Sequence, residues 1–169
     1  MKIPLYLRLL LLLAPLTSVA QVGSLDFTQL RVSGLGATAS EAQVARRLGQ
    51  PLVVVNPHYE CGEYASAPGG SQFYQLRYAQ AVFIGNRQQG YTLESFDFGP
   101  AGPARLTYGG QVLSAATTLG AFTRQFGLSA STPNPDNSVE VLVRRLDATA
   151  SFTFRAGRLT HYEYRGTGC

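Results

Sequence analysis

The sequence predicts an α+β protein with two similar halves, each a short helix packed on an antiparallel β-sheet. The main observation is a stretch that occurs twice, at 40–49 and 118–127, with the same spacing of a hydroxyl residue, two apolar residues and a glycine. The second observation is that runs typical of strands follow each copy. A long period that carries a helix and then a sheet indicates duplication. Chance is the alternative, because these features describe many helices.

Each copy of the stretch predicts a helix of roughly two turns. Ser40 and Thr118 stand at the N-cap, where a side-chain oxygen accepts a hydrogen bond from an early backbone N–H. Gln43 is placed to complete a capping box with Ser40. Gly49 and Gly127 stand where a left-handed residue ends a helix. Because helices this short are marginal alone, both must pack against the rest of the protein.

The strand-like runs divide between the two halves. They cover 52–55, 74–78, 81–84 and 91–98 in the first half, and 139–143, 150–154 and 159–164 in the second. Residues 26–33 are interpreted as an edge strand or an extended lead-in, and 106–113 as a lead-in strand broken by two glycines. Turn formers at 99–104 mark the boundary between the halves. The predicted units are therefore residues 21–99 and 100–169.

The last hairpin allows its register to be predicted. A two-residue turn at Ala156-Gly157 would pair Phe154 with Leu159, whereas a three-residue loop with Gly157 as a bulge residue shifts the pairing by one. The shifted register places Phe152 and Tyr162 on one face and segregates apolar from polar residues better. We therefore predict the bulged loop.

Residues 1–20 have the composition of a secretory signal peptide. Lys2 and Arg8 precede or flank a short apolar core, and small residues occupy 18–20. The core is too short to span a bilayer. We expect a secreted or periplasmic chain that starts at Gln21 and has no transmembrane segment after cleavage, with a retained N-terminal anchor as the alternative. Loss of the leader lowers the net charge from +4 to +2, so a nucleic-acid partner is not indicated.

The two cysteines are Cys61 and Cys169. In an oxidising compartment, a disulfide between them is the default expectation. By reducing the chain entropy of the unfolded state, this disulfide would stabilise the fold by about 4–5 kcal/mol. Two unpaired thiols and an intermolecular bond are the alternatives.

No motif for catalysis, a cofactor or a metal ion stands out, so we predict none of these sites. The two histidines, His58 and His161, are interpreted as exposed surface residues. Glu60 and Glu63 alternate as on the solvated face of a strand, and no Gly-x-Ser-x-Gly turn is present. The alternative is a small envelope hydrolase or metal-dependent enzyme, which would gather a histidine with carboxylates in a pocket.

Three tyrosines are candidate contacts with a protein partner. Tyr59 and Tyr64 lie within the loop region at 56–72, and Tyr74 follows it. Tyrosine is enriched at protein interfaces, which favours this interpretation. Core packing is the alternative for at least one of them.

The repeated stretch resembles that of two related groups, the SmpA/OmlA-type envelope lipoproteins and the β-lactamase inhibitory proteins. Ser40, Val44 and Gly49 match the cap, apolar and glycine positions, and the equivalent residues of the second copy match as well. A glycine two before the cap is replaced by Thr38, and the inhibitors' within-repeat disulfides and the lipoproteins' lipidation cysteine are absent. The chain more loosely resembles uncharacterised secreted bacterial proteins.

The resemblance implies a tandem helix-plus-sheet fold and a non-enzymatic protein-binding module with an unknown partner in the envelope or outside the cell. The matching positions are scaffold residues, so they transfer no contact site. A structural envelope protein that self-associates is a further alternative.

Overall fold

The computed structural model describes residues 23–60, 62–65, 71–99, 103–127 and 137–166. The elements are β1 (Ser24–Leu25), a 3-10 turn (Phe27–Gln29), β2 (Leu30–Val32), β3 (Leu35–Gly36), β4 (Thr38–Ala39), α1 (Glu41–Leu48), β5 (Val53–Val55), β6 (Tyr74–Arg77), β7 (Ala81–Asn86), β8 (Gly90–Asp97), β9 (Leu106–Tyr108), β10 (Gln111–Leu113), α2 (Leu119–Gln125), β11 (Ser138–Val143), β12 (Thr149–Arg155) and β13 (Arg158–Arg165).

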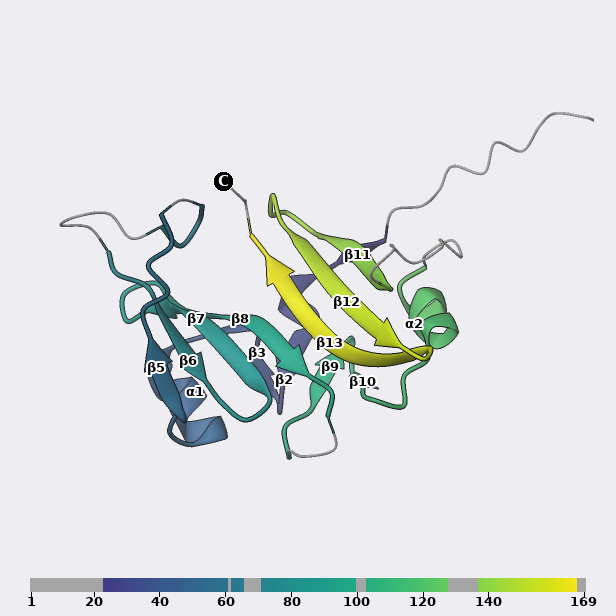
Figure 1. Ribbon diagram of the computed structural model, residues 1–169, viewed down its shortest axis with the longest axis horizontal. Coiled ribbons are helices and arrows are strands. Elements are labelled where there is room, and N and C mark those ends of the chain that lie inside the picture. Colours follow the sequence, from purple (N-terminus) through teal and green to yellow (C-terminus); the bar gives the residue numbers. More distant parts are fainter. Residues whose placement is uncertain (1–22, 61, 66–70, 100–102, 128–136, 167–169) are drawn as a thin grey trace, which may run out of the picture.

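The described residues form two sheets and two α-helices, which confirms the α+β class. The large, nine-stranded sheet has the order β1-β11-β12-β13-β8-β7-β6-β5, and β4 pairs with β8 beside this path. The small sheet has the order β10-β9-β2-β3. Both sheets combine strands from the two sides of the boundary predicted at 99–104 (Figure 1).

The helices begin and end as their caps predict. The Ser40 hydroxyl accepts from the N–H of Gln43 at 3.3 Å, and the Gln43 side chain accepts from the N–H of Ser40 at 2.9 Å, so the capping box forms. The Thr118 hydroxyl caps α2 in the same way, at 3.2 Å from the N–H of Ala121. Gly49 ends α1 with a φ of 86°, a conformation that costs glycine little.

Strands β8 and β13 form the centre of the large sheet, with Phe96 opposite Tyr162. The pairing of each with its own hairpin partner shifts register, between Val82 and Phe83 for β7·β8 and between Thr153 and Phe154 for β12·β13. A bulge adds one residue to a strand and restarts its alternation. Apolar side chains on both sides of each bulge therefore face the core.

The predicted register of the last hairpin is partly wrong. Ala156 and Gly157 both have positive φ and form a two-residue turn, with Phe154 opposite Leu159. The register shift was predicted in the turn but lies inside the strands, between Thr153 and Phe154. Beyond this shift, Phe152 pairs with Tyr162 as predicted. The reason is that Leu159 is fully buried, and only a bulge at this place turns it inward together with Tyr162.

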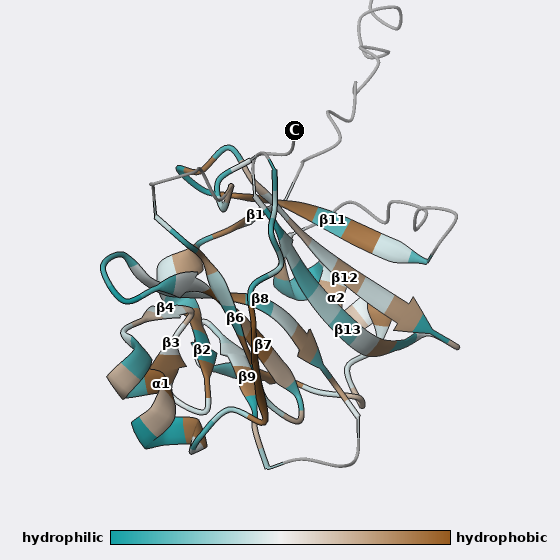
Figure 2. Cartoon of the chain, turned by 60° about the vertical axis from the view of Figure 1, so that its left-hand side comes forward, coloured by the Kyte–Doolittle hydropathy of each residue, from teal (hydrophilic) through white to brown (hydrophobic). Residues whose placement is uncertain are grey.

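The small sheet and the two helices cover one face of the large sheet. Strand β2 pairs with both β9 and β3, so residues 30–32 form an interior strand and not the edge strand considered for this segment. Figure 2 shows α1 beside β2 and β3. Toward the β1 end of the large sheet, the ring centroid of Phe122 on α2 lies 4.6 Å from that of Phe152 on β12. The core lies between these layers, and the other face of the large sheet is the outer face.

Strand β1 ties the start of the described chain to the far end of the large sheet. It pairs in parallel with β11, with Leu25 opposite Val143. Leu25 is fully buried. No helix in the described part of the chain is both long and apolar enough to cross a membrane.

Candidate binding cleft and edge strand

A cleft of about 500 Å³ opens where the core face of the large sheet continues past the N-terminus of α1. Its apolar wall comes from Val54 of β5, Tyr74 and Leu76 of β6, and Tyr91 of β8. Its rim is polar and consists of Glu41, Ser71, Gln72, Asn86, Arg87 and Gln88. Apolar walls with a few polar groups around them are the usual composition of a binding site.

The strand register sets the shape of the cleft. Val54 lies opposite Leu76, and Tyr74 lies opposite Gly85, which in turn lies opposite Tyr91. The two tyrosines therefore stand in one cross-strand row with a glycine between them. A Cβ on Gly85 would collide with the backbone of Gly90 and Tyr91 at the start of β8, so no side chain can separate the two rings.

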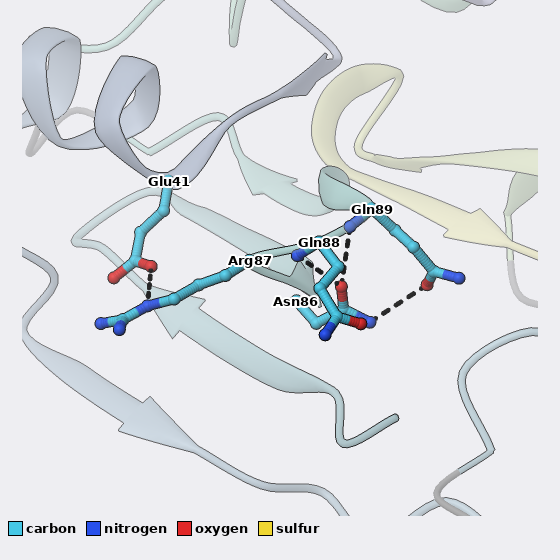
Figure 3. A network of polar contacts seen from close by, with 5 residues as sticks. All are labelled: Glu41, Asn86, Arg87, Gln88 and Gln89. Atoms are coloured by element: carbon cyan, nitrogen blue, oxygen red, sulfur yellow. Dashed lines mark hydrogen bonds and ion pairs between the residues drawn. The ribbon is translucent and has the colours of Figure 1, made fainter. Parts of the chain in front are cut away.

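The polar rim is held by the turn between β7 and β8 (Figure 3). The Asn86 carboxamide oxygen accepts from the N–H groups of Gln88 and Gln89 at 3.0 and 2.8 Å, and its nitrogen donates to the Gln89 side chain at 3.0 Å. The Arg87 Nε donates to a Glu41 carboxylate oxygen at 2.8 Å. An exposed ion pair of this kind contributes little stability, but it joins the turn to the start of α1 across the rim.

Strand β5 ends the large sheet and is strongly apolar and exposed. Leu52, Val53 and Val54 are 72%, 52% and 56% exposed. Edge strands of natural proteins are usually protected by charges, prolines or bulges, because their free backbone groups pair with other chains. The residues of β5 carry no charge.

The hydrogen-bond alternation shows which backbone groups of β5 are free. The N–H of Tyr78, the residue after β6, donates to the carbonyl of Ala81 at the start of β7. The backbone groups of even-numbered residues in β6 therefore bond toward β7, and those of odd-numbered residues bond toward β5. Val53 lies opposite Arg77 and Val55 lies opposite Gln75, so the backbone N–H and C=O groups of both valines face β6. The N–H and C=O of Val54 therefore point to the open edge of the sheet.

The three tyrosines predicted as contacts occupy different places. Tyr74 lies in the cleft and is 38% exposed. Tyr59 is also 38% exposed but lies on the outer face. Tyr64 is half-buried, with its ring centroid 5.5 Å from that of Phe73, and burial raises the pKa of its hydroxyl. The structure thus brings one of the three to the cleft.

A small polar network surrounds Tyr59 on the outer face. Its hydroxyl donates to a Glu94 carboxylate oxygen at 3.0 Å, and the Gln75 amide donates to the other oxygen at 2.8 Å. Burial raises the pKa of Glu94, while these two hydrogen bonds act in the opposite direction. Arg77 donates to the Gln75 carboxamide oxygen at 2.7 Å and completes the network.

The histidines lie apart from the cleft. Nδ1 of His161 is 2.7 Å from a carboxylate oxygen of Asp97 on the outer face, and both side chains are exposed. His58 is exposed in a loop, with a φ of 53°. Within the described ranges, no three residues of the types that ligate metals cluster. Neither histidine is among the residues that line the cleft.

Two sequence predictions lie outside the described residues. Cys61 and Cys169 are both outside them, as is the leader at 1–20. The disulfide and the signal peptide therefore stay predictions.

Comparison of the chain with family models, curated proteins and solved structures gives no match. The candidate site therefore depends on the geometry alone. Sequence reasoning missed the edge position of β5 and the roles of Tyr91 and Arg87. The available signal was the uncharged run at 52–55 between Pro51 and Pro57.

Proposed function

We propose that the chain is a secreted or periplasmic, non-enzymatic module that binds another protein through the cleft beside β5. The observation that carries this proposal is the tyrosine-walled cleft, whose wall includes the exposed side chain of Val54 on edge strand β5. Tyr74 is its accessible aromatic residue. Exposed tyrosines in partly enclosed apolar sites are typical of the residues that dominate binding energy at interfaces.

The arrangement suits a protein partner. Val54 of the cleft wall is 56% exposed at the end of the sheet, so the apolar surface continues beyond the enclosed part of the cleft. The rim supplies the Gln88 carboxamide, which can both donate and accept hydrogen bonds, and the exposed Arg87 guanidinium, which donates them. A partner loop that places an apolar side chain between Tyr74 and Val54 would meet these groups at its backbone.

The proposal includes two similar halves joined about a pseudo-two-fold axis. Several features support it. The bulges in β8 and β13 lie at matching distances from the central Phe96–Tyr162 pair. The turns that precede β3 and β10 have similar positive φ values in the same order, 51° and 85° at 33–34 and 57° and 81° at 109–110. Leu93 and Leu159, at matching positions, each donate to a carbonyl of the segment before the helix of their own half.

The test uses the equal exposure of Tyr74 and Tyr59. Three forms of the full chain are immobilised: unchanged, Tyr74→Ala and Tyr59→Ala. Each is exposed to envelope and secreted proteins of the source cells, and the captured protein is then purified and titrated. We expect saturable binding that weakens at least about tenfold, roughly 1.4 kcal/mol, for Tyr74→Ala and stays unchanged for Tyr59→Ala.

A photo-crosslinker in place of Tyr74 locates the contact directly. It should form an adduct with the captured partner, and the same crosslinker in place of Tyr59 should not. Absence of any saturable partner, or equal loss of binding for both alanine variants, would count against the cleft as the binding site.

A further inference from the structure

Strand β5 is symmetric about Val54, because valines stand one position away on either side at 53 and 55. Prolines stand three positions away at Pro51 and Pro57, whereas the positions between, Leu52 and Asn56, differ. The strand is uncharged, lies at the end of the large sheet, and is exposed over Leu52 to Val54. Figure 1 shows β5 as the last strand on the left of the sheet.

This symmetry matches the geometry of an antiparallel strand pair. The backbone groups of Val54 point to the open edge, so two copies related by a two-fold axis through Val54 would each donate and accept one hydrogen bond there. Val53 of one copy then lies opposite Val55 of the other. The N–H of Leu52 donates to the Arg77 carbonyl at 2.8 Å and so faces β6, which limits the pairing between the copies to β5 itself.

We propose that two copies of the chain pair through β5 to form a two-fold dimer with one continuous sheet. The occupant of the edge is a second copy because the segment is complementary to itself: β-branched side chains meet β-branched side chains, which favours sheet pairing, and no like charges face each other. The contact is isologous, which means that it buries the same surface on both copies, and the assembly therefore stops at a dimer.

The opposite end of the sheet does not offer the same surface. It ends in β1, which has two residues and pairs in parallel with β11. Pairing through β5 alone therefore gives a dimer and not a filament. The two clefts would lie on the same face of the joined sheet, on either side of the two-fold axis, because Val54 lines its cleft from the edge strand.

The proposal goes beyond the proposed function and does not depend on it. A dimer forms or fails in the purified protein without any other partner, and Tyr74→Ala, which tests the cleft, leaves the residues of β5 unchanged. Failure of one proposal is therefore distinguishable from failure of the other.

Sedimentation equilibrium of the purified chain over a wide concentration range tests the dimer. We expect twice the monomer mass for the unchanged chain. Val54→Lys places two like charges across the two-fold axis and should raise the dimer dissociation constant at least tenfold. Val112→Lys is the matched control, because Val112 is 51% exposed on edge strand β10 of the small sheet, and it should dimerise like the unchanged chain.

A second variant, Val54→Pro, removes the one N–H that faces the open edge and no bond to β6. It should be monomeric with an unchanged circular dichroism spectrum. The sedimentation runs are repeated with a thiol reductant, so that a dimer held by Cys61 or Cys169 is recognised. A monomeric unchanged chain, a dimer lost on reduction, or equal dimerisation of the Val54→Lys and Val112→Lys variants would overturn the proposal.

Discussion

Replacement of Tyr162 by phenylalanine should stabilise the protein. Tyr162 is fully buried at the centre of the large sheet, and its hydroxyl has no hydrogen-bond partner among the described residues. A buried unsatisfied polar group costs about 1–3 kcal/mol. The void left by the oxygen is roughly 15 Å³, about one water-sized sphere, and costs about 0.4 kcal/mol at roughly 24 cal/mol per Å³. The expected net gain is about 1 kcal/mol.

Urea unfolding followed by circular dichroism measures this gain, and the melting temperature should rise by about 2–4 °C. The control is Tyr164→Phe, two residues along the same strand. The Tyr164 hydroxyl donates to a Glu63 carboxylate oxygen at 3.0 Å, so its removal should destabilise by about 1 kcal/mol. If both variants lose stability, the assignment of the Tyr162 hydroxyl as unsatisfied is refuted.

Three further predictions concern pH and glycine. Burial raises the pKa of Tyr164, so the folded chain keeps a proton that the unfolded chain releases near pH 10, and unfolding titrations should show stability falling as pH rises above about 10. Burial also raises the pKa of Glu94 above 4.5, so stability should fall as pH rises from that value toward neutral, and Glu94→Gln should remove this slope in urea titrations. Gly85→Ala should cost about 3 kcal/mol or more in melts because its Cβ would collide with the Gly90 carbonyl oxygen, whereas Gly120→Ala, with open space around it on α2, should gain up to about 1 kcal/mol.

The helices were predictable from the sequence because their signals are local. Ser40 and Gln43 cap α1 through bonds that span three residues, and Gly49 ends it through its own φ. The predicted strand runs are likewise present as strands, since alternation and β-branched residues act over four to eight positions.

The bulges and the cleft were not predictable for the opposite reason. The bulge near Thr160 exists because Leu159 and Tyr162 both reach a core formed by distant elements. The run that includes Val54 reads as a buried strand by composition, and only the strand order places it at the edge. Tyr91 joins Tyr74 in the cleft through the register of β7 with its neighbours, which no short window of sequence contains.

The parallel pairing of β1 with β11 sets an order for folding. The side chain of Arg144 donates to the Ser24 hydroxyl at 3.1 Å across 120 positions of the chain. As the chain emerges from its N-terminus during synthesis, residues 24 and 25 have no place to dock until β11 has been made. Contacts between such distant segments pay their loop-closure cost late and slow folding. Docking of Leu25 therefore cannot precede the formation of β11, and its burial would report that β11 is in place.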